Sequence, residues 1–252
     1  MGVRATGDPA DPSLVKERIR RRIWSLLEER GVSRFPKPAF GRIPNFVGAE
    51  VAALKLADQA EFEDAEVVKV NPDSPQRTVR RLVLRRGKLL IMPSPRLSRG
   101  FIILNPDRIP DRAIDRASSI RGAFNYGELC PLRSLPKVDL VVAGSVAVSK
   151  SGVRIGKGGG YSEMEYAILR ELNLVGEETP IFTTVHDLQV IDEAPLEPHD
   201  LTVDAIITPT RIIRVMRRMP RPKGIIWEEI TREHLMRMPI LSELKRIKRS
   251  RR

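Results

Sequence analysis

The first marked pattern in the chain is an apolar stripe with helical spacing. Its members recur at intervals of three or four residues, which places them on one side of a helix: Val15, Ile19, Ile23, Leu26 and Leu27. Ahead of the stripe, Asp11 is a suitable N-cap and Pro12 suits the first helical position, while Gly31 suits the end of a helix. The pattern predicts a helix from residue 12 to residue 30.

Further along, short apolar runs alternate with amphipathic segments. The runs predict strands: "EVVKV", "KLLIMP", "FIIL", "VDLVVAGSVAV", "PIFTTV", "AIITPTRII" and "GIIWEEI". The segments "GAEVAALKLADQAEF", "IDRASSIRGAF" and "EMEYAILREL" predict helices, and "TVRRLVLRRG" fits either a strand or a crossover helix. This alternation predicts an α/β fold with an open, mostly parallel sheet.

Length and charge bound the class of protein. The chain has 252 residues, and we expect a single domain of residues 1–240 followed by a basic tail of residues 241–252. Lysine and arginine number 44 against 32 acidic residues, and six of the basic residues lie in the last eight, "KRIKRSRR". The excess of positive charge favours anionic partners, including nucleotides and, through the tail, RNA. A solvated terminus is the alternative interpretation of the tail.

Two further features concern the compartment. No apolar run approaches the about 20 residues that a membrane-spanning helix requires, so we expect no membrane partner. Cys130 is the only cysteine, which permits no internal disulfide and fits a reducing cytoplasm. We therefore expect a cytoplasmic protein.

A glycine-rich stretch, "GVRIGKGGGY", lies between a predicted strand and a predicted helix. Glycines allow backbone N–H groups to approach a phosphate closely, and the start of the following helix adds a positive dipole end. Lys157 lies inside the stretch and Arg154 just before it. Lys157 is followed by Gly158 rather than by Ser or Thr, so the stretch is not a Walker A loop. The last spacing in Gly156-x-Gly158-x-Gly160 differs from that of a dinucleotide fingerprint. The residues favour a phosphate-binding loop, with a flexible glycine turn as the alternative.

Three motifs in the same order resemble the 5-formyltetrahydrofolate cyclo-ligase family, also called 5,10-methenyltetrahydrofolate synthetases. They are "KERIR", "RIGKGGGYSE" and "LEPHDLTVDAIITP", and the resemblance covers roughly residues 13–215. The stretches "FPKPAFGRIPNFVGAEVAA", "GSVAVS", "VHDLQVID" and "ITPTRII" are similar to the branch named methenyltetrahydrofolate synthase domain-containing proteins. The resemblance implies helices on both faces of the sheet, in a three-layer sandwich like those of ribose-5-phosphate isomerase and the CoA transferases.

The resemblance also implies an activity in one-carbon metabolism. Members of the family use ATP and Mg²⁺ to convert 5-formyltetrahydrofolate to 5,10-methenyltetrahydrofolate, with release of ADP and phosphate. We therefore expect an ATP-dependent, ring-forming ligase that acts on a reduced folate or pterin, as a monomer or homodimer. The alternative is a non-catalytic nucleotide- or RNA-binding protein that retains the fold.

Site residues follow from the matching motifs. Lys157 and Arg154 would be catalytic, Glu50 and Tyr161 would contact the substrate, and Glu163 and Asp204 would be linked to magnesium. The residues that would bind ATP are Lys16, Arg20, Arg154, Gly156, Lys157, Gly158, Gly159, Gly160 and Tyr161.

The chain departs from the family pattern at the end of the glycine stretch. Ser162 and Glu163 stand where the pattern has Tyr-Asp, and the longer glutamate would shift a magnesium site because Mg²⁺ demands near-ideal geometry. His186 and His199 each precede an aspartate, but the sequence offers no third ligand for a metal. We expect structural or loop roles for these histidines.

Overall fold

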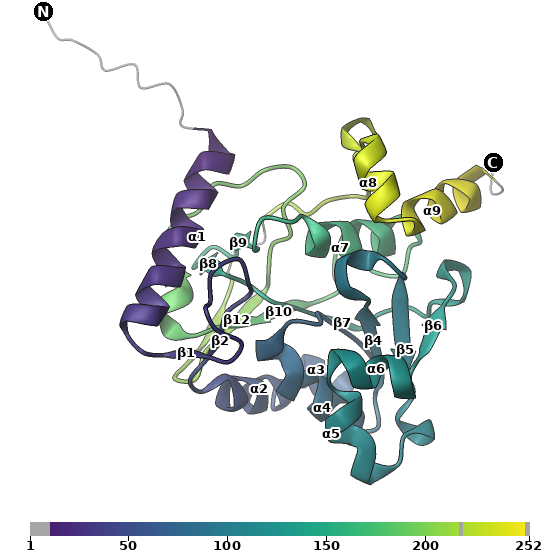
Figure 1. The fold of residues 1–252 in the computed structure, drawn as a ribbon, viewed down its shortest axis with the longest axis horizontal. Coiled ribbons are helices and arrows are strands. Elements are labelled where there is room, and N and C mark those ends of the chain that lie inside the picture. Colours follow the sequence, from purple (N-terminus) through teal and green to yellow (C-terminus); the bar gives the residue numbers. More distant parts are fainter. Residues whose placement is uncertain (1–10, 217–218, 250–252) are drawn as a thin grey trace, which may run out of the picture.

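The computed structural model describes residues 11–216 and 219–249, and a central sheet of eight strands organises them (Figure 1). The strands are β3 (Val67–Val70), β4 (Leu89–Pro93), β5 (Phe101–Leu104), β6 (Glu128–Cys130), β7 (Leu140–Ala143), β10 (Ile181–Thr184), β12 (Ala205–Ile207) and β13 (Ile212–Arg214). Their order across the sheet is β13-β12-β10-β7-β3-β4-β5-β6. The pairs from β12 to β4 are parallel, whereas β13 at one side and β5 and β6 at the other join through antiparallel pairs. The predicted mostly parallel sheet is confirmed.

Helices cover both faces of this sheet. One face carries α2 (Ala49–Ala57), α3 (Ala60–Asp64), α4 (Arg77–Arg85), α5 (Ile114–Ala117) and α6 (Ile120–Tyr126), and the other carries α7 (Tyr161–Glu171), α8 (Arg232–Arg237) and α9 (Ile240–Arg249). Along β7, Leu140 and Val142 pack with α2–α6, whereas Val141 and Ala143 pack with α7 and α9. This alternation buries β7 on both faces, as predicted for the run "VDLVVAGSVAV". The run is not one strand, however, because its second part is β8 (Ala147–Ser149) in a separate sheet. Among the described residues, no helix is long and apolar enough to cross a membrane.

The first helix packs beside the sheet as a separate layer. Helix α1 (Pro12–Glu29) begins as predicted, since Asp11 Oδ1 accepts a hydrogen bond from Ser13 N at 2.9 Å. Its apolar side contacts a three-stranded sheet, ordered β11-β8-β9, of β8 (Ala147–Ser149), β9 (Arg154–Ile155) and β11 (Val190–Ile191). A two-stranded sheet, β1 (Ser33–Arg34) with β2 (Asn45–Phe46), follows α1. This layer brings the start of α1 beside the glycine-rich stretch after β9.

Several predicted elements differ in their extent. The run "AIITPTRII" folds as two strands, because Thr208 N bonds Arg211 O at 2.9 Å and closes a hairpin between β12 and β13. The predicted helix in "IDRASSIRGAF" is two short helices, and Ser119 caps the second of them. The run "GIIWEEI" contains no strand, because Glu171 of α7 binds Ile225 N and Trp227 Nε1, which holds this segment against α7.

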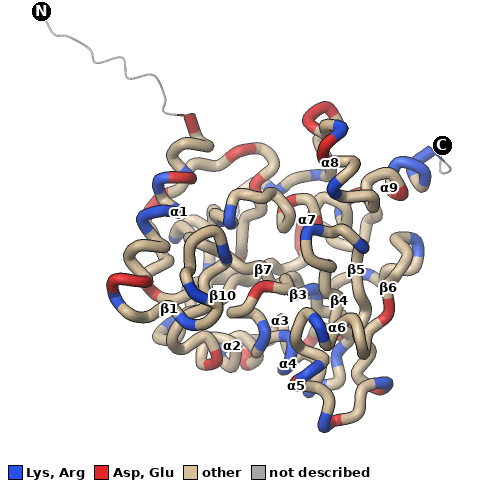
Figure 2. The backbone as a smooth tube through the Cα atoms, in the orientation of Figure 1, with Lys and Arg blue, Asp and Glu red and all other residues tan. Residues whose placement is uncertain are grey.

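The C-terminal residues pack on the domain rather than leaving it at residue 240. Helix α9 covers most of the predicted tail of residues 241–252, and its apolar side is buried through Leu241, Leu244 and Ile247. Figure 2 shows its basic residues along the same helix. The boundary between residues 240 and 241 therefore falls inside a packed helix, and residues 250–252 lie outside the described part of the chain.

Candidate active site

The glycine-rich stretch forms a loop at the start of α7. Gly158 and Gly160 have φ angles of +97° and +65°, a backbone region that favours glycine. Gly160 is the N-cap of α7 and supplies no side-chain acceptor to the first turn of this helix. The first N–H groups of α7 therefore have no side-chain cap from Gly160, an arrangement that suits an anion at the start of the helix.

Three cavities meet at this loop in the described part of the chain, and all three are lined by Gly160 and Glu163. The large cavity, of about 550 Å³, lies between the loop and the segment that follows β3. The α1 cavity, of about 240 Å³, lies between the loop and α1. The C-terminal cavity, of about 260 Å³, lies between α7 and residues 222–238. The loop is thus the common wall of three compartments.

The α1 cavity concentrates opposite charges. The ammonium of Lys16, which is buried, lies 2.5 Å from Glu197 Oε2 and 2.5 Å from Asp200 Oδ2. Arg20 donates from Nε to Gly156 O at 2.8 Å, which ties α1 to the glycine loop. Both basic residues that the first motif predicted therefore lie at the loop.

Arg154 and Glu163 form a buried ion pair beneath the loop. Arg154 is 2% exposed, donates from Nε to Gly144 O at 2.8 Å and pairs through its guanidinium with the Glu163 carboxylate. Burial by itself raises the pKa of Glu163, but the positive charge of Arg154 and the hydrogen bonds to the carboxylate outweigh it, so the pKa is lowered. Glu163 is therefore held as a carboxylate where the three cavities meet.

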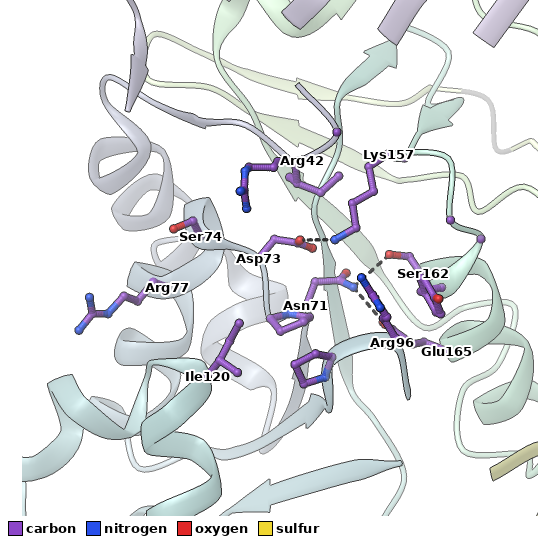
Figure 3. Close-up of a pocket in the computed structure, with 18 of the residues that line it drawn as sticks. Arg42, Asn71, Asp73, Ser74, Arg77, Arg96, Ile120, Lys157, Ser162 and Glu165 are labelled. Atoms are coloured by element: carbon purple, nitrogen blue, oxygen red, sulfur yellow. Dashed lines mark hydrogen bonds and ion pairs between the residues drawn. The ribbon is translucent and has the colours of Figure 1, made fainter. Parts of the chain in front are cut away.

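The large cavity has a basic rim (Figure 3). Lys157 extends across it and donates from Nζ to Asp73 Oδ1 at 2.9 Å. The exposed residues Arg42, Arg77 and Arg96 lie around the same cavity. This cavity is suited to a polar, anionic molecule larger than a phosphate.

A second buried ion pair lies at the floor of the large cavity. Lys69 Nζ is 2.5 Å from Glu165 Oε2, and the two side chains are 1% and 4% exposed. Asn71 Nδ2 donates to the same carboxylate oxygen at 2.8 Å and to Ser162 Oγ at 3.0 Å. Burial raises the pKa of Glu165, and the nearby Lys69 ammonium opposes this effect only in part.

Two predicted site residues do not join the others. Glu50 is exposed in the first turn of α2 and lines none of the three cavities. Asp204 precedes β12, at the opposite end of the parallel strands from the loop, where it accepts from Ile181 N at 2.8 Å and pairs with Arg221 at 2.5 Å. The structure therefore does not bring Asp204 to Glu163, since Arg221 and the backbone of β10 hold its side chain elsewhere.

Sequence reasoning missed the acidic group that does lie at the loop. Glu197, His199 and Asp200 line the α1 cavity together with Glu163, and one ligand atom from each of the three lies within 4.8 Å of the others. The signal in the sequence was "EPHD", residues 197–200. Its aspartate, Asp200, precedes the predicted magnesium-linked residue Asp204 by four positions. His199 therefore has two acidic neighbours, Glu197 and Asp200, with which it could bind a metal ion. The sequence alone did not show this grouping.

Comparisons with known proteins agree with this architecture. Residues 12–209 match the model of the 5-formyltetrahydrofolate cyclo-ligase family. The 5,10-methenyltetrahydrofolate synthetase structure from Aquifex aeolicus has a TM-score of 0.50 and 19% identity, over 82% of this chain and 95% of that one. At this identity the likeness concerns the fold.

The curated relatives include both branches of the family. The mouse methenyltetrahydrofolate synthase domain-containing protein is 44% identical over 234 residues, or 91% of this chain and 63% of the relative. The human protein of that name is 42% identical over 94% of this chain and 63% of its own length. The Escherichia coli 5-formyltetrahydrofolate cyclo-ligase is 24% identical over 77% of this chain and 97% of the relative. The chain thus spans less than two thirds of the animal relatives, and it belongs to the 5-formyltetrahydrofolate cyclo-ligase family.

Proposed function

We propose that the chain is an ATP-dependent, ring-forming ligase that converts 5-formyltetrahydrofolate or a related reduced pterin to the 5,10-methenyl form, releasing ADP and phosphate. The observation that carries this proposal is the meeting of three cavities at one glycine loop. A phosphate bound at the loop would lie beside the basic residues of the α1 cavity and next to the large cavity, because the loop lines both. Family membership supports the same reaction class.

The nucleotide phosphates would be held by the loop and by α1. Backbone N–H groups at the start of α7 point toward an anion, and Lys16 and Arg20 supply charge from the opposite side. Arg154 lies beneath the loop and lines both the α1 cavity and the large cavity. Lys16 and Arg154 pair with carboxylates in this structure, so both would share or exchange these partners when the nucleotide binds.

The acidic residues of the α1 cavity would hold a magnesium ion once the Lys16 ammonium, which pairs with Glu197 and Asp200 in this structure, binds the phosphates instead. Mg²⁺ prefers oxygen ligands, and Glu163, Glu197 and Asp200 bring three carboxylates to one cavity beside the phosphate loop. Bound there, the ion would neutralise phosphate charge. We therefore propose Glu163 with Asp200 and Glu197, in place of the predicted pair of Glu163 and Asp204.

The chemistry needs positioning more than side-chain nucleophiles. The formyl oxygen attacks the γ-phosphorus and ADP leaves; N10 then attacks the activated carbon and loses its proton, and the carbon–oxygen bond breaks to release phosphate, which takes up that proton. Lys157 lies over the large cavity, where Asp73 holds its ammonium in place. It can offset the negative charge that shifts during phosphoryl transfer, which lowers the barrier when the charge is preorganised.

A spectrophotometric assay tests this function. The full chain is mixed with 5-formyltetrahydrofolate and Mg-ATP, and methenyl absorbance and ADP are followed together. We expect equal amounts of both products, and a fall of about 10²-fold in kcat for Lys157→Ala. Lys150→Ala is the matched control, because Lys150 is exposed, pairs with Asp192 and lines none of the three cavities. Absence of both products from the folded wild type would refute the ligase assignment.

A further inference from the structure

The C-terminal cavity is built partly by residues outside the family match. The match ends at residue 209, whereas one wall of this cavity comes from residues 222–238. The opposite wall is α7, through Met164 and Ala167. The family match therefore does not account for this compartment.

The lining of this cavity is mostly apolar, with a few polar side chains. Ile225, Ile226 and Ile230 face Met164 and Ala167 across it. Its polar lining residues are Glu163, His199, Glu229 and His234. Apolar faces with a few polar groups at the edge suit a flat heteroaromatic ring, which stacks through its faces and hydrogen-bonds through its rim.

The C-terminal wall is tied to α7 by several interactions. Glu171 Oε1 accepts from Ile225 N and from Trp227 Nε1, each at 3.2 Å, and Glu171 Oε2 lies 2.5 Å from Lys248 Nζ. Lys245 lies 4.9 Å from the centre of the Trp227 ring, in a cation–π contact. These bonds preform the cavity, so a ligand would not have to order the wall on binding.

Size and position indicate which part of a ligand this cavity takes. At about 260 Å³ it is smaller than the roughly 300–1,000 Å³ of sites that hold a whole drug-sized molecule. It shares Gly160, Glu163 and His199 with the α1 cavity, where the phosphates would lie. A molecule that reaches from one compartment to the other has a ring at one end and phosphates at the other.

We propose that the C-terminal segment, residues 222–238, forms the base-binding subsite for a purine nucleotide whose phosphates lie at the glycine loop. This inference rests on the proposed nucleotide-dependent function. The large cavity then remains for the second substrate. The terminal phosphate of the nucleotide would lie between that substrate and the base. Nucleotide affinity thereby depends on a part of the chain that lies beyond the family match.

Two variants in opposite walls test the subsite in the full chain. Ala167→Leu fills the cavity from α7 and keeps a strong helix former in place, and Ile226→Ala removes apolar contact from the C-terminal wall. Met236→Ala is the control, because Met236 is 74% exposed on α8 and does not line the cavity. Thermal unfolding checks that each variant is folded.

Calorimetry compares two probes, Mg-ATP and magnesium tripolyphosphate, which has the phosphates without the base. We expect Ala167→Leu and Ile226→Ala to weaken Mg-ATP by about tenfold or more, with tripolyphosphate affinity unchanged and Met236→Ala like the wild type. If the wild type binds both probes and the folded Ala167→Leu variant binds Mg-ATP normally, the subsite is elsewhere and the inference is overturned. If both probes weaken equally, the cavity acts on the phosphate loop and the inference also fails. Failure of the wild type to bind either probe would instead overturn the nucleotide-dependent function on which the inference rests.

Discussion

Two glutamates on the first turns of α7, one partly and one fully buried, have opposite pKa shifts. For Glu163, burial is outweighed by the charge of Arg154 and hydrogen bonds, and the pKa falls. For Glu165, burial outweighs the attraction of Lys69, and the pKa rises. Two residues with the same side chain, two positions apart, therefore bind protons differently because their partners and solvation differ.

Glu163→Gln gives a pH-dependent test of the first pair. A lowered pKa means that the ionised carboxylate stabilises the fold above its ordinary pKa of 4.5, and that this stability is lost as the pH falls through the lower folded-state value. We expect the difference in free energy of unfolding between the wild type and Glu163→Gln to be largest near neutral pH and to shrink below pH 4.5. Urea unfolding at a series of pH values measures it. A difference that stays constant with pH would contradict the ion pair.

The pair of Lys69 and Glu165 should show strong coupling. Removing one partner leaves a buried charge without compensation, so Lys69→Met should cost about 3–5 kcal/mol of unfolding free energy. The double variant Lys69→Met/Glu165→Met should be more stable than Lys69→Met alone, because it buries no unpaired charge. Denaturant unfolding of both single variants and the double variant closes the cycle. Additive losses would show that the two residues do not interact.

Asp200 and Asp204 provide a matched pair for the metal-binding proposal. Asp200→Asn removes a carboxylate from the α1 cavity and should weaken Mg-ADP binding by about tenfold or more. Asp204→Asn should lower the melting temperature, since Arg221 is buried and loses a charged partner, but should leave Mg-ADP affinity of the folded protein unchanged. Calorimetry and thermal unfolding of both variants separate the two roles. The reverse result would restore the assignment of Asp204.

At the scale of elements, α9 shows how charge can obscure packing. The letters "KRIKRSRR" suggested a solvated tail, but Leu241, Leu244 and Ile247 recur every three residues and are buried in the core. Two of the basic residues also have partners within the chain, because Lys248 pairs with Glu171 and Lys245 lies over Trp227. Part of the charge assigned to RNA binding therefore serves to hold α9 and the C-terminal wall together.

Leu244→Ala tests whether α9 belongs to the domain. Leu244 is fully buried, so its truncation should lower the free energy of unfolding by about 2–5 kcal/mol. Arg246→Ala on the exposed side of the same helix should change it by about 0.5 kcal/mol or less. Both values come from denaturant unfolding. Equal and small effects would mean that α9 is detached in solution.

At the scale of the whole molecule, the site is assembled from four distant segments. The start of α1, the loop after β9, residues 197–200 and residues 222–238 meet around Gly160 and Glu163. A ligand that contacts all of them joins the separate layers of the fold. Its binding energy should therefore appear as stability of the entire chain.

Mg-ATP should raise the melting temperature of the protein. A ligand that binds only the folded state, at 100 times its Kd, adds about 2.7 kcal/mol. Differential scanning fluorimetry across a concentration series measures the shift, with Mg-AMP as the comparison because it lacks the β- and γ-phosphates. A flat melting temperature up to millimolar Mg-ATP would contradict a nucleotide site.

Local patterns predicted the elements whose causes are local. The cap at Asp11, the stripe on α1 and the apolar run of β7 all depend on residues a few positions apart, and the structure confirms each of them. The glycine loop was also visible, because its backbone needs glycine at Gly158 and Gly160 irrespective of distant contacts. Where an element depended on a distant partner, as "GIIWEEI" depends on Glu171, local pattern gave a strand that does not exist.

By itself, the sequence determined the α/β alternation, the first helix and the glycine loop, since periodicity and glycine act within a few residues. Only the tertiary structure decided which acidic residue meets the loop. Asp200 and Asp204 lie in one short motif, yet Asp200 faces Lys16, which is 184 positions away, and Asp204 faces Arg221 at the other end of the strands. A charged side chain takes its role from the partner and the solvent that surround it, and those are set by chain segments that no local pattern records.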